Sequence, residues 1–261
     1  MTDTAIYDVL RKLNMRGSAE EYQYQCEHPA IYRDMDFDSR LKILLNKETE
    51  RRSAKKIQRL IRQADFKFPD ACVENILYDE SRHLDKEKIN TYAACGYIDD
   101  YMNLIIQGAT GSGKTWLSCA LGVSACRQGR KVRYIRAPQL LEELMVAKET
   151  GDLHNFISGY ARYDEIIIDD WLISSLNVDE TLCVLEFLEG CEKRCSLVFC
   201  TQYPSDAWYD RINSNEENKP VGEAVFERII FSSDNPIKLQ GESSIREKLW
   251  KERVGKATRK K

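Results

Sequence analysis

The stretch NLIIQGATGSGKT, residues 103–115, decides the fold that this sequence predicts. It joins a short apolar strand to the pattern G-x-x-x-x-G-K-[ST] at the start of a helix. Glycines let successive backbone N–H groups face phosphates, and the following helix adds the positive end of its dipole. In this pattern the lysine reaches the β- and γ-phosphates, and the threonine hydroxyl binds Mg²⁺. The stretch therefore predicts a site for ATP and magnesium, made by Gly108, Ala109, Thr110, Gly111, Ser112, Gly113, Lys114 and Thr115.

Strands and helices alternate after this stretch. Further strands are expected at 132–136 (VRYIR), 165–169 (EIIID) and 196–200 (SLVFC). Helical patterns follow the first three of the four strands, over 115–128, 139–148 and 179–193. Such alternation predicts an α/β fold, in which helices cover both faces of a parallel sheet.

The chain before residue 67 has a different pattern. Leucine and isoleucine recur at helical spacing through residues 1–62, with basic residues between them. This pattern predicts a small all-helical module of two to four helices. Residues 63–102 are less periodic and contain Pro69 and Gly96, so we expect a junction there. The predicted domains are 1–66, which binds DNA or a partner, and 67–261, which binds nucleotide and ends in a basic tail.

Composition excludes several classes of protein. The chain is 43% hydrophobic and 31% charged, as in ordinary globular proteins. We find no apolar stretch near the roughly 18 to 20 residues that span a bilayer, and no secretion signal. A cytoplasmic protein without a membrane partner is expected. The nine cysteines include no Cys-x-x-Cys pair, so neither a metal–thiolate site nor a disulfide is predicted.

Charge is unevenly distributed although the net charge is only −3. Residues 40–67 carry ten basic and three acidic side chains, and the tail from Lys248 carries seven basic and one acidic. A locally basic helix indicates a polyanion partner, with a merely solvated helix face as the alternative. The candidate DNA contacts are Lys55, Lys56, Arg59 and Arg62.

Two acids end the strand at 165–169. Asp169 is expected to hold magnesium through its water shell, and Asp170 to orient and deprotonate the attacking water. Paired acids that only cap a strand end are the alternative. Their position about fifty residues after the glycine-rich loop favours the catalytic interpretation.

Polar and basic residues nearer the C-terminus complete the candidate site. Gln202, or Thr201 as second choice, follows a strand and could touch the γ-phosphate, unless it only forms a turn before Pro204. Arg228 lies on the outer face of an amphipathic helix over 223–231, where it could reach a neighbouring subunit's ATP. Arg246 by itself indicates little.

With these residues in place, the chain resembles AAA+ ATPases of the IstB/DnaC type over nearly its whole length. The similarity begins at Leu10–Glu20, which is similar to the family's start of a helix. It continues through the basic helix, the glycine-rich loop, the acidic strand and the segments Thr201–Pro204 and Ala207–Trp208. It closes with Ala224–Arg228 and Lys238–Ser243, and Trp208 and the final Gly-Glu-Ser favour the IstB type.

The resemblance implies a role for each candidate residue. Asp169 and Asp170 correspond to the Walker B pair, and Gln202 to the sensor-one residue. Arg228 corresponds to the arginine finger that acts in trans, and Arg246 to the sensor-two arginine. Proteins of this type form homo-oligomers with ATP between subunits, bind and deform double-stranded DNA and recruit a partner, here a transposase.

The sequence leaves other interpretations open. A DnaC-like loader of a replicative helicase has the same motifs, and a P-loop kinase has the same loop. Asp170 also departs from the glutamate that many AAA+ proteins carry, and this shorter side chain predicts slow hydrolysis. The polar segment 213–220 is expected to form a loop between Gln202 and Arg228.

Overall fold

A computed structural model describes residues 4–78, 84–212 and 219–240 of the chain. The chain forms two compact units, Met1–Arg59 and Leu60–Lys261. The sequence predicts the division after residue 66 instead. The observed division lies earlier, after Arg59, because Leu60, Ala64 and Phe66 are buried in the hydrophobic core of the second unit.

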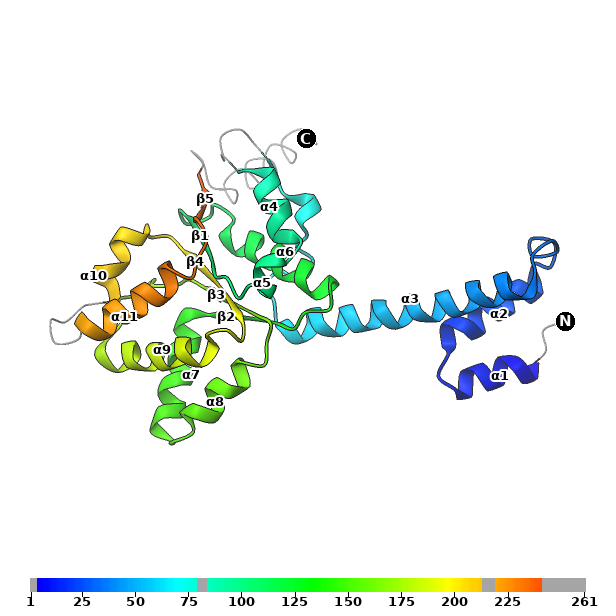
Figure 1. Ribbon diagram of the computed structural model, residues 1–261, viewed down its shortest axis with the longest axis horizontal. Coiled ribbons are helices and arrows are strands. Elements are labelled where there is room, and N and C mark those ends of the chain that lie inside the picture. Colours follow the sequence, from blue (N-terminus) through cyan, green and yellow to red (C-terminus); the bar gives the residue numbers. More distant parts are fainter. Residues whose placement is uncertain (1–3, 79–83, 213–218, 241–261) are drawn as a thin grey trace, which may run out of the picture. The chain divides into compact units, whose positions relative to one another are not determined.

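Helices make up the described part of the first unit, as expected. They are α1 (Thr4–Lys12), α2 (Arg16–Glu27) and α3 (Phe37–Ala64), whose last turn belongs to the second unit (Figure 1). Gly17, at the start of α2, lies close against α3. A β-carbon at this position would come within 2.8 Å of the carbonyl oxygen of Lys47. The glycine therefore permits this close helix packing.

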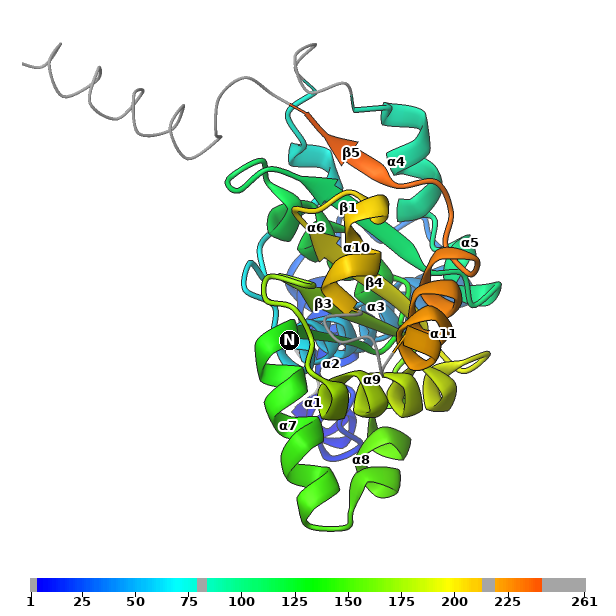
Figure 2. The same cartoon turned by 90° about the vertical axis from the view of Figure 1, so that its left-hand side faces the viewer.

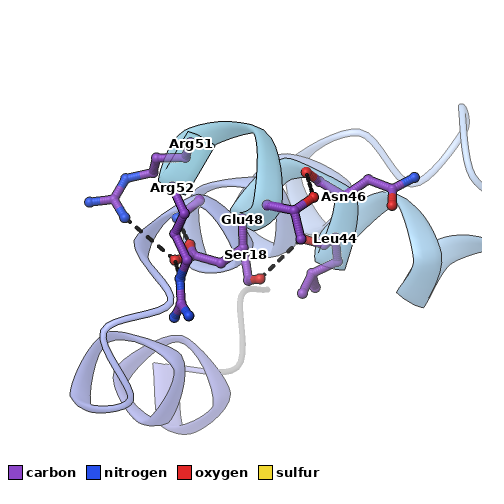
Figure 3. A network of polar contacts seen from close by, with 8 residues as sticks. Ser18, Leu44, Asn46, Glu48, Arg51 and Arg52 are labelled. Carbon is purple, nitrogen blue, oxygen red and sulfur yellow. Dashed lines mark hydrogen bonds and ion pairs between the residues drawn. The ribbon is translucent and has the colours of Figure 1, made fainter. Parts of the chain in front are cut away.

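Glu48 links the beginning of α2 to α3 (Figure 3). Its buried carboxylate accepts from the backbone N–H of Gly17 at 2.7 Å and from Arg52 Nε at 2.7 Å. Nearby, the Ser18 hydroxyl donates to the carbonyl of Leu44 at 3.0 Å. Although burial opposes it, hydrogen bonds from Arg52 and from the first turn of α2 lower the pKa of Glu48. A charged carboxylate therefore satisfies N–H groups that a helix start leaves without a partner.

A five-stranded parallel sheet forms the centre of the second unit. The strand order is β2-β3-β4-β1-β5, and all paired neighbours are parallel. The four strands that the sequence predicts are confirmed within one residue, and β5 is an addition. The strands are β1 (Leu104–Gly108), β2 (Val132–Arg136), β3 (Glu165–Asp169), β4 (Ser196–Thr201) and β5 (Ile237–Leu239).

Helices cover both faces of this sheet (Figures 1 and 2). Alternate strand residues enter two separate cores, with Ile106 and Ile167 in one and Ile105 and Ile168 in the other. The first core contains α4 (Lys86–Ala93), α5 (Gly96–Asp99) and α6 (Lys114–Arg127). The second contains α7 (Ala137–Glu149), α8 (Leu153–Tyr160), α9 (Val178–Cys191), α10 (Trp208–Ile212) and α11 (Lys219–Ile230).

The expected junction over residues 63–102 contributes to the first core. It contains a short 3-10 helix, Val73–Asn75, together with α4 and α5. A second 3-10 helix, Ser205–Ala207, precedes α10. None of the helices in residues 4–78, 84–212 and 219–240 is both long and apolar enough to cross a membrane. All nine cysteines are free thiols, of which seven are buried.

Candidate ATP site

The glycine-rich loop connects β1 to α6, as the sequence predicts. Gly111 and Gly113 adopt positive φ angles of 81° and 96°, which side chains with a β-carbon rarely allow. The ammonium of Lys114 donates to the carbonyl oxygens of Gly108 at 2.8 Å and Ala109 at 3.0 Å. Lys114 therefore lies over its own loop, where phosphate oxygens would compete with these carbonyls for the ammonium.

Asp169 lies beside this loop because β3 ends next to the start of α6. Its side chain is buried, and its Oδ2 accepts from the Thr115 hydroxyl at 2.8 Å. The same Oδ2 accepts from the Tyr134 hydroxyl at 2.8 Å. Oδ1 is buried without a hydrogen-bond partner among the described residues. One oxygen of the carboxylate is thus satisfied by the protein, and the other has no partner among the described residues.

These groups fit magnesium, which prefers oxygen ligands and is usually held by one or two side chains, waters and phosphates. Asp169 supplies an unpaired buried carboxylate oxygen, and Thr115 supplies a hydroxyl. The described residues contain no group of three or more His, Cys, Asp or Glu side chains that could hold a metal alone. A site completed by nucleotide phosphates agrees with both observations.

Asp170 is held by a residue that the sequence did not indicate. Its backbone is left-handed, with φ of 57°, and its Oδ2 accepts from Arg136 Nε at 3.0 Å and Nη2 at 2.9 Å. Arg136 ends β2 directly beside Asp169 in the strand register. The sequence shows that Arg136 ends a predicted strand. Only the strand order, however, shows that this strand lies beside β3 and brings Arg136 next to Asp170.

Gln202 meets the glycine-rich loop from β4. Its Oε1 accepts from the Thr110 hydroxyl at 3.0 Å, and its Nε2 donates to the Tyr203 hydroxyl at 3.1 Å. β4 lies next to β1, with Thr201 opposite Gln107, so both strands end at the same edge of the sheet. Thr201, the second choice, is buried, and its hydroxyl accepts from the backbone N–H of Tyr203.

Arg228 makes no hydrogen bond or ion pair with the glycine-rich loop, Asp169, Asp170 or Gln202 among the contacts of the described residues. It donates from α11 to Glu189 of α9 at 2.7 Å, and 37% of its side chain is exposed. The sequence predicted an exposed arginine, and the ion pair with α9 explains why it is partly covered. Arg228 lines a groove of about 520 Å³ together with Tyr101 and Phe231. Arg246 lies outside the described residues.

The four candidate DNA contacts are all exposed on α3. Lys55, Lys56 and Arg59 belong to the first unit, and Arg62 belongs to the second. None of the four forms an ion pair with an acidic side chain of residues 4–78, 84–212 or 219–240. Arg51 and Arg52 differ, because both pair with Glu48. The basic segment therefore combines structural cations with cations that remain available to a polyanion.

Solved structures match the fold over about two thirds or more of the chain. An AMPPCP-bound DnaA from Aquifex aeolicus matches with a TM-score of 0.56 and 18% identity, over 74% of this chain and 57% of that one. A DnaC helicase loader matches with a TM-score of 0.52 and 16% identity, over 66% of this chain and 97% of that one. At such identities the likeness concerns the fold alone, and it agrees with the predicted α/β fold with a parallel sheet.

Sequence comparison is more specific. The chain is 36% identical over 196 residues to the "Insertion sequence IS1162 putative ATP-binding protein" of Pseudomonas fluorescens, covering 75% of this chain and 84% of that protein. Residues 8–252 match the model of the family described as IstB-like ATP binding protein. With the glycine-rich loop, Thr115 and Asp169 assembled at one edge of the sheet, the chain belongs to the IstB-like ATP-binding proteins of insertion sequences.

Proposed function

We propose that this protein is an ATP-dependent helper of transposition, which oligomerises on duplex DNA and delivers that DNA to a transposase. The observation that carries the ATP-dependent part is the hydrogen bond between Thr115 and Asp169 beside the glycine-rich loop. It joins the hydroxyl and the carboxylate that a magnesium–nucleotide complex requires. The association of relatives with insertion sequences supports transposition.

In the proposed hydrolysis, Lys114 leaves the carbonyls of its loop and binds the β- and γ-phosphates. Thr115 and Asp169 would hold magnesium, whose charge would offset that of the phosphates. Asp170 orients the attacking water and accepts its proton, while Gln202 contacts the γ-phosphate or the water. The hydrogen bond between Gln202 and Thr110 already places this amide at the loop, which supports that role.

Assembly is proposed to bring a second subunit to each ATP. Arg228 would leave Glu189 and reach the γ-phosphate of the neighbour, and Arg246 would contact the nucleotide of its own subunit. Mixing two inactive variants tests action in trans. Lys114→Ala and Arg228→Ala should each be inactive alone and regain part of the ATPase activity when mixed. No recovery in a mixture that still co-assembles would exclude the role in trans.

DNA is proposed to bind the free cations of α3 through its phosphates, largely without reading sequence. Replacing Lys55, Lys56 and Arg59 by glutamate should weaken binding and flatten its salt dependence, by about 0.9 in log–log slope for each lost contact. Arg62→Glu tests the fourth residue separately. The same charge change at the exposed Lys131, Arg162 and Arg194 is the matched control. Equal effects of both triple variants would contradict this assignment.

The partner is tested by capture from purified components. With ATP and duplex DNA present, the protein should form a larger assembly and retain transposase but not replicative helicase. Lys114→Ala is the control, because it should lose assembly and capture together. Preferential retention of the helicase would favour the loader interpretation instead. Phosphate transfer to a small acceptor, without stimulation by DNA, would favour a kinase.

A further inference from the structure

The two oxygens of the Asp169 carboxylate have different surroundings. Oδ2 accepts two hydrogen bonds, from the hydroxyls of Thr115 and Tyr134, each at 2.8 Å. Oδ1 is buried but has no partner within the described residues. Because an unpartnered buried carboxylate oxygen is costly, this arrangement indicates that Oδ1 faces a ligand.

Strand geometry explains how Tyr134 reaches Asp169. β2 and β3 are parallel neighbours, with Arg136 opposite Asp169, so Tyr134 lies two residues back on the same face of the sheet. A diagonal neighbour of this kind is within reach of an aromatic side chain. The ring of Tyr134 is buried in the first core, with Ile167 in the same cluster, so the surrounding side chains fix its direction.

The two hydroxyl donors have different tasks. Thr115 lies at the start of α6, and its hydroxyl oxygen is also the expected ligand of magnesium. Tyr134 lies on β2, and its hydroxyl has Asp169 as its hydrogen-bond acceptor. Only Tyr134 can therefore restrain the carboxylate without itself being a ligand.

We propose that Tyr134 is a positioning residue for magnesium: it holds Oδ2 of Asp169 toward the protein, so that Oδ1 faces the metal and its waters. This role rests on the proposed binding of magnesium and ATP at the same site. It adds a residue from β2 to the site, although Tyr134 touches neither phosphate nor metal. Outer-shell partners of this kind typically contribute 10- to 100-fold to metal affinity.

The test is Tyr134→Phe, which removes one hydroxyl and keeps the ring. The measured quantity is the Kd of a fluorescent ATP analogue, with Mg²⁺ and with EDTA. We expect affinity in Mg²⁺ to fall about tenfold and the Mg²⁺ titration midpoint to rise, with affinity in EDTA unchanged. A merely structural role would lower both affinities together.

The matched control is Tyr97→Phe at the opposite end of β3. It removes another buried phenol–carboxylate hydrogen bond, between Tyr97 and Glu165 at 2.5 Å, far along the strand from the nucleotide. This variant should lose stability but keep the Mg²⁺ dependence of the wild type. Circular dichroism checks that each variant is folded. Tyr134→Leu serves as a second variant without the hydroxyl if the Tyr134→Phe variant does not fold.

Two results overturn the inference. One is an unchanged Mg²⁺ midpoint in folded Tyr134→Phe, and the other is an equal loss of affinity in Mg²⁺ and EDTA. Failure of the proposed function gives a different result, because the wild type itself would then bind nucleotide without any effect of Mg²⁺.

Discussion

Glu165 at the start of β3 makes stability depend on pH near neutrality. Its carboxyl is fully buried, one oxygen accepts from Tyr97, and the other has no partner among the described residues. Burial raises the pKa of Glu165 to about 7, with a further contribution from the charge of Asp164, while the hydrogen bond from Tyr97 opposes the rise. Below about pH 7, the protonated form is thus favoured in the folded state.

The sign and size of the effect follow from linkage. Because the folded pKa lies above the unfolded value of 4.5, the stabilising contribution is complete below pH 4.5 and is lost as pH rises through about 7. A difference of about 2.5 pH units corresponds to about 3 kcal/mol, as an order of magnitude. Glu165→Gln keeps an acceptor for Tyr97 but cannot ionise, so it removes this dependence.

The assay is urea unfolding of the wild type and Glu165→Gln at pH 5, 6, 7 and 8. Subtracting the two free energies of unfolding cancels the other titrating groups. We expect the variant to gain on the wild type as the pH rises, mostly between pH 5 and 7, by about 2.5 kcal/mol in total from pH 5 to pH 8. A difference that stays constant from pH 5 to 8 would refute the reasoning, because Glu165 would then have an ordinary pKa.

The remaining predictions concern the site and the first unit. Lys114→Ala should lower ATP affinity at least tenfold in calorimetric titration without changing the unfolding midpoint, and unchanged affinity would contradict the assigned phosphate contact. Arg136→Gln should raise ATP turnover with unchanged Kd, because it frees the Asp170 oxygen that now accepts from Arg136; slower turnover would mean that Arg136 orients Asp170 productively. Gly17→Ala should destabilise the N-terminal unit by about 1–3 kcal/mol, since its β-carbon would lie 2.8 Å from Lys47 O. Amide hydrogen exchange should be faster in α2 and α3 of the variant than in the wild type, and unchanged exchange rates in these helices would contradict the prediction.

The sequence determined the local parts of this protein. The glycine-rich loop requires positive φ angles and a following helix, so its residues alone predict its shape and its ligand. Strands and helices alternate after it, which is typical of a parallel sheet with helices on both faces. Thr115, Asp169 and Gln202 could be predicted as site residues because they stand at the start of the helix after the loop, at the end of a strand and directly after a strand.

Only the tertiary structure decided which elements are neighbours. β5 and α8 escaped sequence analysis, because Ile237–Leu239 has only three residues and the helix Leu153–Tyr160 has only eight. Tyr134 and Arg136 became part of the site because β2 pairs with β3, and Arg228 was found partly covered because α11 packs against α9. Contacts between residues far apart in sequence depend on strand order and helix packing, and these are set by burial of the whole core rather than by any local pattern.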